Sequence, residues 1–97
     1  MTNKVYLVTY NTDNNFNNSV FYKHISTVLY PQYISDWWHY LENVYIVISS
    51  LDVNQIYNLI SPQLGGRNLL IIEINPTNAQ GWLPKKAWEW IQKYQIR

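Results

Sequence analysis

Hydrophobic positions at the start of the chain predict a strand followed by a helix. Residues Val5–Tyr10 are mostly β-branched or aromatic and form a short run, which is typical of a strand. After an Asn-rich loop, apolar residues recur at helical spacings from Phe16 to Leu29 and give one face of an amphipathic helix. Pro31 ends this helix, because proline lacks the backbone N–H and disfavours helical angles in the preceding residue.

The middle of the chain predicts a β-hairpin and then a second helix. Trp37–Leu41 and Val44–Ile48 are two strand-like runs joined by the short turn at residues 42–43. Asp52 is suited to cap the next helix, and Gln55 three residues later completes a capping-box pattern. The apolar positions of this helix share one face and are Val53, Ile56, Tyr57, Ile60 and Leu64.

The last third of the chain predicts one more strand and one more helix. Pro62 breaks the last turn of the second helix, and the glycines at 65–66 end it. Leu69–Ile74 reads as the fourth strand. Pro84 is well placed as the first residue of a last helix that ends near Tyr94.

The predicted order is β-α-β-β-α-β with a last helix, in one domain spanning residues 1–97. We therefore expect an α+β fold, a ferredoxin-like βαββαβ sandwich with an extra carboxy-terminal helix. One sheet face should then be polar, yet the predicted strands are apolar on both sides. The last helix and a second copy of the chain are the two candidates to cover that face, and we favour a homodimer packed sheet to sheet.

Composition narrows the classes of protein to consider. The chain has 97 residues and no cysteine, which excludes disulfide scaffolds, thiolate metal sites and cysteine nucleophiles. Its net charge of +1 argues against both an acidic DNA mimic and a strongly basic nucleic-acid clamp. Charged residues make up only 13%, so we expect an aromatic and Asn-rich surface. The chain shows neither a signal peptide nor a membrane span, which predicts a cytoplasmic protein without membrane association.

Three stretches resemble a known family. They are a first strand with its following residue (5–11), an aromatic hairpin (37–47) and a Gly-Trp-Leu-Pro ending (81–90). Together they are similar to a small bacterial family labelled SinR-like, which is itself similar to the smaller CRISPR adaptation protein and to related ribonuclease toxins. The label suggests a DNA-binding regulator, but no helix-turn-helix pair is visible in the sequence.

The resemblance implies a specific metal site. In the relatives, an Asp just after the first strand of each subunit lies near the twofold axis and is proposed to hold a divalent metal for phosphodiester cleavage. The matching residue here is Asn11, whose neutral amide supplies no charge. Asp13, two residues further on, is the candidate substitute for holding Mg²⁺ or Mn²⁺, and the competing interpretation makes it a turn residue that bonds its own loop.

Two further features are candidate sites. His39 lies between aromatic residues and is a candidate general base or metal ligand, although a histidine in an aromatic strand more often packs and forms hydrogen bonds. The last helix carries Lys86, Trp90, Lys93 and Arg97 at i, i+4, i+7 and i+11, a basic stripe with one aromatic. Such a stripe suits nucleic acid, because cations contact phosphates and aromatic rings stack on bases, but it also fits a plain solvated helix face.

The sequence therefore predicts a non-catalytic dimeric binding module that resembles the small CRISPR adaptation subunit. Its expected ligand is nucleic acid, or a protein of a bacterial antiviral defence or mobile-element system. The alternatives are a divalent-metal-dependent nuclease with a displaced carboxylate, and a small inhibitor of a defence complex. The first interpretation needs no cofactor, whereas the nuclease needs Mg²⁺ or Mn²⁺.

Overall fold

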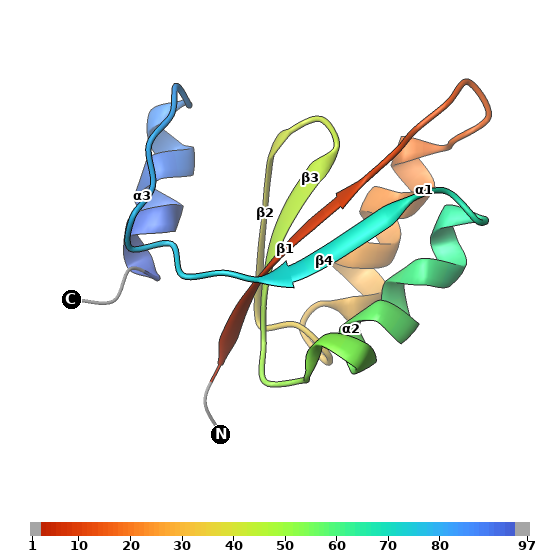
Figure 1. Cartoon of the computed structure of the whole chain (residues 1–97), viewed down its shortest axis with the longest axis horizontal. Helices are drawn as coiled ribbons and strands as arrows, with labels where there is room; N and C mark the ends of the chain where they lie inside the picture. Colours follow the sequence, from red (N-terminus) through yellow and green to blue (C-terminus); the bar gives the residue numbers. More distant parts are fainter. Residues whose placement is uncertain (1–2, 95–97) are drawn as a thin grey trace.

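A four-stranded antiparallel sheet in the order β2-β3-β1-β4 forms the centre of the molecule (Figure 1). The computed structural model describes residues 3–94. In this part of the chain the elements are β1 (Lys4–Tyr10), α1 (Asn18–Lys23), the π-helix η1 (His24–Leu29), β2 (Asp36–Leu41), β3 (Val44–Ser49), α2 (Val53–Ile60), the 3₁₀-helix η2 (Ser61–Leu64), β4 (Leu69–Glu73) and α3 (Lys85–Lys93). The predicted α+β class is confirmed.

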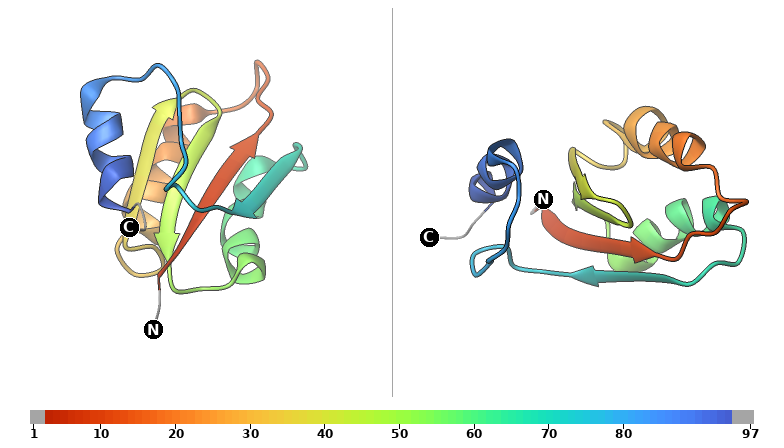
Figure 2. Two further views of the ribbon diagram at one scale, coloured as in Figure 1. Left: turned by 60° about the vertical axis from the view of Figure 1, so that its left-hand side comes forward. Right: turned by 90° about the horizontal axis from the view of Figure 1, so that it is seen from above.

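Two connections of the chain contain helices: α1 and η1 connect β1 to β2, and α2 and η2 connect β3 to β4. Each of these crossover connections joins two parallel strands that have another strand between them. β1 pairs antiparallel with both β3 and β4, and β2 pairs antiparallel with β3. It follows that β1 runs parallel to β2, and β3 runs parallel to β4. The helices of both connections lie on one side of the sheet, whereas α3 lies on the other (Figure 2).

The main hydrophobic core lies between the sheet and the crossover helices. Alternate residues of β1 and β3 point into it, as the period of two in a strand requires. The Tyr6 hydroxyl in this core donates a 2.7 Å hydrogen bond to the Leu51 carbonyl, so its polar atom is satisfied. The buried members of the core are Tyr6, Val8, Tyr10, Phe21, Ile25, Leu29, Ile34, Tyr45, Val47, Ile56, Ile60 and Leu64.

The second face of the sheet is also apolar, as predicted, and α3 covers part of it. Trp38 of β2 and Ile46 of β3 are buried against Ala87 and Ile91 of α3. The Trp38 Nε1–H donates to the Ala87 carbonyl at 3.2 Å. The edge of this face that β4 forms is open. Its residues Leu70 and Ile72, which point away from the crossover helices, remain about half exposed. The last helix thus covers part of this face. That a second copy of the chain covers the rest stays a prediction.

The ends of the helices differ in detail from the predicted ones. The first helix starts at Asn18, because the Asn17 side chain accepts the Val20 N–H at 3.1 Å and caps it, and it changes to a π-helix at His24. The capping box of α2 is present as predicted. Pro84 precedes the last helix instead of being its first residue. No helix within residues 3–94 combines the length and apolar character needed to cross a bilayer.

Candidate functional site

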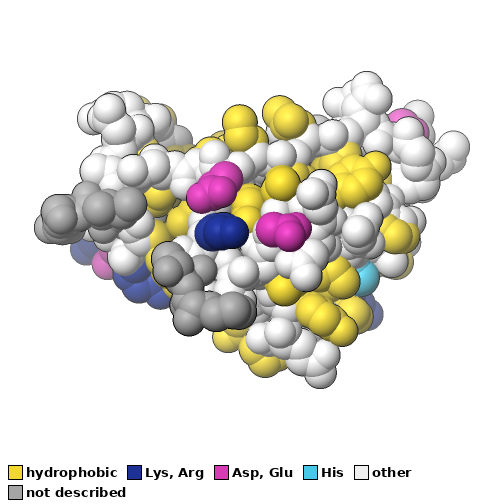
Figure 3. Space-filling view, turned by 60° about the horizontal axis from the view of Figure 1, so that its bottom comes forward, with side chains coloured by type: hydrophobic (Ala, Val, Ile, Leu, Met, Phe, Trp, Pro, Cys, Tyr) yellow, Lys and Arg dark blue, Asp and Glu magenta, His cyan; other side chains and the backbone are white. Residues whose placement is uncertain are grey.

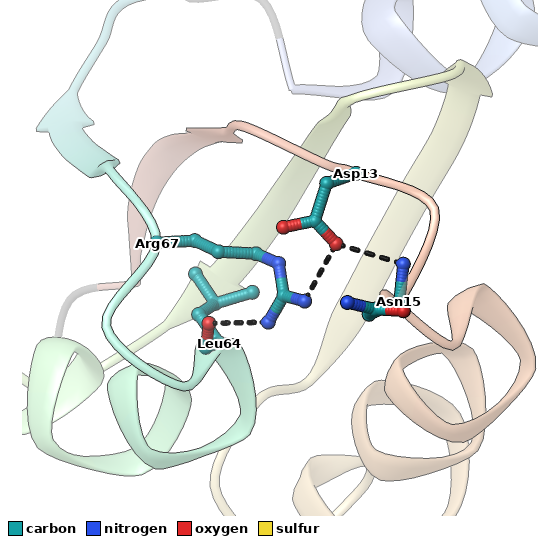
Figure 4. A network of polar contacts seen from close by, with 4 residues as sticks. All are labelled: Asp13, Asn15, Leu64 and Arg67. Carbon is teal, nitrogen blue, oxygen red and sulfur yellow. Dashed lines mark hydrogen bonds and ion pairs between the residues drawn. The ribbon is translucent and has the colours of Figure 1, made fainter.

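The two loops at one end of the sheet are tied together by an ion pair between Asp13 and Arg67 (Figure 4). Asp13 lies in the loop after β1, and Arg67 lies between η2 and β4. Arg67 Nη2 is 2.7 Å from Asp13 Oδ1, which also accepts the backbone N–H of Asn15 at 3.0 Å. The hydrogen bond from Arg67 is the largest influence on Asp13 and holds the pKa of its carboxyl below its usual value.

These contacts fit the turn interpretation of Asp13 better than the metal-ligand interpretation. The carboxylate bonds its own loop backbone, as Asx turns do, and faces a guanidinium charge that opposes a cation. Asn11 directly follows β1, and its backbone N–H donates to the Asn68 carbonyl at 3.0 Å. Within the described part of the chain, no three His, Asp or Glu side chains gather in an arrangement suited to a metal ion. The metal role of Asn11 and Asp13 stays a prediction.

Arg67 organises this end of the molecule, a role that the sequence alone did not reveal. Its Nη1 donates to the Leu64 carbonyl at 2.9 Å, and its guanidinium lies 5.1 Å from the centre of the Phe16 ring. Gly65 has a φ of 57°, in the left-handed region, which turns the chain at the end of η2 before Arg67. The side chain therefore connects the loop after β1 with the end of η2, two segments that are far apart in the sequence.

His39 of β2 packs and forms a hydrogen bond, which agrees with the structural interpretation of this residue. Its ring stacks on Tyr45 with a centroid distance of 3.9 Å. Its Nδ1 lies 3.0 Å from the Val44 carbonyl oxygen and therefore donates to it. The sequence prediction of a general base or metal ligand stays a prediction, with Nε2 as the ring nitrogen that remains available.

The predicted basic stripe is only partly an open cationic surface. Lys86, Trp90 and Lys93 do lie together and line a shallow pocket of about 460 Å³, but Glu89 lines it as well. The Lys93 ammonium is 3.6 Å from Asp36 Oδ2 of β2, so its charge is partly compensated. Arg97, the fourth member of the stripe, lies outside the described residues.

Asp36 anchors the end of α3 to the sheet. The Tyr94 hydroxyl donates to Asp36 Oδ2, and the Lys93 ammonium lies near the same oxygen. Partial burial alone would raise the pKa of Asp36, but the hydrogen bonds from the Tyr94 hydroxyl and the Trp37 backbone N–H and the charge of Lys93 outweigh burial and lower it. For Tyr94, burial first and then the contact with Asp36 raise the pKa of the phenol. Part of the stripe thus serves to dock the helix.

Comparison of the chain with models of protein families, with curated proteins and with solved structures gives no match.

We expect the purified protein to leave single-stranded and double-stranded DNA and RNA intact in the presence of Mg²⁺ or Mn²⁺. Position 11 carries a neutral amide, and the Asp13 carboxylate is paired with Arg67. End-labelled substrates resolved on a denaturing gel measure this. Arg67→Gln, which frees the carboxylate, serves as a second test and should also be inactive. Metal-dependent cleavage that Asp13→Ala abolishes would establish the nuclease alternative instead.

Proposed function

We propose that this protein is a cytoplasmic, non-catalytic binding module that works as a homodimer, like the small CRISPR adaptation subunit that its motifs resemble. A ferredoxin-like fold is part of this proposal. It is supported by the strand order β2-β3-β1-β4, by antiparallel pairing throughout and by two crossovers whose helices share one face. The paired state of Asp13 favours binding over catalysis.

The observation that carries the homodimer is an uncovered apolar strip on the second face of the sheet. We call the side chains of Leu7, Leu70 and Ile72 the open strip, because they lie side by side on β1 and β4 away from the crossover helices. Leu70 is 56% exposed and Ile72 is 49% exposed. Apolar groups gathered on a sheet face gain free energy when a partner removes them from water.

A second copy of the chain is a suitable partner for the open strip. Two copies related by a twofold axis present the same apolar strip to each other, so the interface is complementary to itself. The net charge of +1 per chain gives little long-range repulsion between copies. Figure 3 shows how sparse charges are on one face of the molecule, where hydrophobic side chains surround a small group of charged ones.

We expect light scattering of the wild-type protein to give a mass of twice the 11.6 kDa chain. The double variant Leu70→Lys/Ile72→Lys should be a folded monomer, because lysines in the open strip would bury unpaired charge at the interface. Val20→Lys is a matched control, since Val20 is 52% exposed on α1 and lies outside the strip. A wild-type protein that stays monomeric at high concentration contradicts the homodimer and means that α3 suffices to cover the sheet.

Nucleic acid is the ligand that a second observation favours. Lys86 and Lys93 lie on the same face of α3 on either side of Trp90, and both residues are exposed. Lysines spaced along an exposed helix can contact successive phosphates, and an aromatic side chain between them can contribute stacking.

Binding through α3 predicts a steep dependence on salt. Each phosphate contact contributes a slope of about −0.7 to −0.9 to the log–log plot of affinity against salt. Replacing Lys86, Lys93 and Arg97 by alanine should flatten that slope, and fluorescence titration of a labelled oligonucleotide at several salt concentrations measures it. Lys4→Ala removes one positive charge from β1, outside the stripe, and is a control that should leave the slope nearly unchanged. Wild-type protein without salt-sensitive binding would leave a protein of a defence system as the ligand.

A further inference from the structure

A second pocket lies on the side of the sheet opposite α3. Asn18, Ser19, Tyr22 and Lys23 of α1 and His39 of β2 line a shallow space of about 390 Å³, which we call the α1 pocket. The four helix residues occupy two adjacent i, i+4 rows and therefore share one face of α1. Volumes of this size are typical of small-ligand sites.

The chemistry of the α1 pocket is that of an anion site. Its lining offers an ammonium, an amide, two hydroxyls and an imidazole, and none of its lining residues is acidic. Across residues 3–94, Asp13–Arg67 and Asp36–Lys93 are the ion pairs present, so Lys23 has no carboxylate partner there. An ammonium without a counterion beside several neutral donors attracts a group that carries negative charge and many acceptor oxygens.

His39 is held so that one nitrogen can serve this pocket. Its ring is fixed by stacking on Tyr45, and its Nδ1–H donates to the Val44 carbonyl. Because Nδ1 is used in this bond, Nε2 is the ring nitrogen of His39 that is left for a ligand in the pocket. With the proton on Nδ1, Nε2 accepts a hydrogen bond, which a protonated phosphate oxygen or a ribose hydroxyl of a nucleotide can donate.

Tyr22 adds an aromatic surface to the pocket, which a ligand with a ring can contact and a simple anion cannot use. Tyr22 is 44% exposed, and its ring makes an edge-to-face contact with Trp37 at a centroid distance of 5.3 Å, which holds it in place. A base can stack on an exposed aromatic ring. A nucleotide would therefore use both parts of the pocket, the phosphate at Lys23 and His39 and the base at Tyr22.

We propose that the α1 pocket binds the phosphomonoester of a nucleotide, supplied by a free mononucleotide or by the 5′ end of a nucleic-acid strand. This site goes beyond the proposed function, because it lies on the other side of the sheet from the open strip and α3. It needs neither a dimer nor the basic stripe.

The test is a titration of adenosine 5′-monophosphate into the full chain, followed by calorimetry and by amide shifts in nuclear magnetic resonance spectra. Wild-type protein should saturate, with the largest shifts at α1 and at His39. Lys23→Gln should weaken binding about tenfold, as expected for the loss of one charge-assisted hydrogen bond. His39→Phe keeps an aromatic ring over Tyr45 and removes Nε2, so it should also weaken binding.

Lys85→Gln is the matched control, since it removes one exposed lysine of α3 on the other side of the sheet and should leave affinity unchanged. Adenosine, which lacks the phosphate, should bind far more weakly than the monophosphate. A 5′-phosphorylated tetranucleotide that binds more tightly than the mononucleotide, and loses this gain in Lys23→Gln, assigns the site to strand ends, and equal or weaker binding assigns it to free nucleotides. The proposal is overturned by a wild-type protein that does not saturate, by equal affinity for adenosine, or by a folded Lys23→Gln variant that binds as wild type.

Discussion

Replacing Trp38 by alanine should lower the free energy of unfolding by about 3–5 kcal/mol, a loss typical of large buried aromatic residues. The Trp38 side chain is only 2% exposed and lies between β3 and α3. Its removal leaves a cavity between sheet and helix and eliminates the bond from Nε1 to Ala87. Since a domain of this size is stabilised by about 5–15 kcal/mol in total, urea unfolding should show a much lower midpoint.

Trp82 provides a matched control for this experiment. Its side chain is 99% exposed in the segment before α3, so Trp82→Ala should change the free energy of unfolding by less than about 0.5 kcal/mol. Equal stability of the two variants would contradict the packing of α3 on the second face of the sheet. It would also mean that this face is open across its whole width.

The elements that were predicted well are those whose signals are local in the sequence. The hairpin strands Asp36–Leu41 and Val44–Ser49 lie within one or two residues of their predicted bounds, because a short turn brings neighbouring strands together. Asp52 and Gln55 form the expected capping box through two reciprocal bonds of 2.9 Å. The break at Pro62 is also as predicted, since η2 replaces the last turn of the helix.

The contacts that were missed join residues far apart in the sequence. Asp13 and Arg67 are separated by 54 positions, and no pattern in either loop marks them as partners. The change from α1 to a π-helix at His24 was also missed, because the apolar spacing from Phe16 to Leu29 predicts one continuous helix.

At the candidate sites, too, the sequence predicts neighbours on one helix but not the contacts that distant segments make with them. The sequence identified Lys93 and Trp90 correctly as neighbours on one helix face, because helical spacing alone decides that. It could not reveal that Asp36, in a distant strand, lies against Lys93 and changes what that face offers a ligand. The α1 pocket was missed for the same reason, since His39 reaches α1 only through the tertiary fold.

Asp36→Asn should weaken the docking of α3 and remove one source of acid sensitivity. Asp36 is partly buried and accepts a hydrogen bond from Tyr94, so the loss of its charge should cost about 1 kcal/mol after allowance for solvent screening. Because folding lowers the pKa of Asp36, its contribution is present above the pKa of about 3.9 in the unfolded chain, and it is lost as pH falls through the lower folded value. The Tyr94 pKa is raised instead, so its contribution is lost only as pH rises above about 10.

Urea unfolding of wild type and Asp36→Asn at about pH 7 and about pH 2 measures this contribution, and the two proteins should differ at the first pH and converge at the second. Glu89→Gln removes an exposed carboxylate from the same helix and should match wild type at both. Amide hydrogen exchange should place the loss in α3, whose amides would open more readily in Asp36→Asn than in the Glu89 control. A stability gap that persists unchanged in acid would show that the Asp36 charge does not hold the helix, and that Trp38 and Ile91 dock α3 by packing alone.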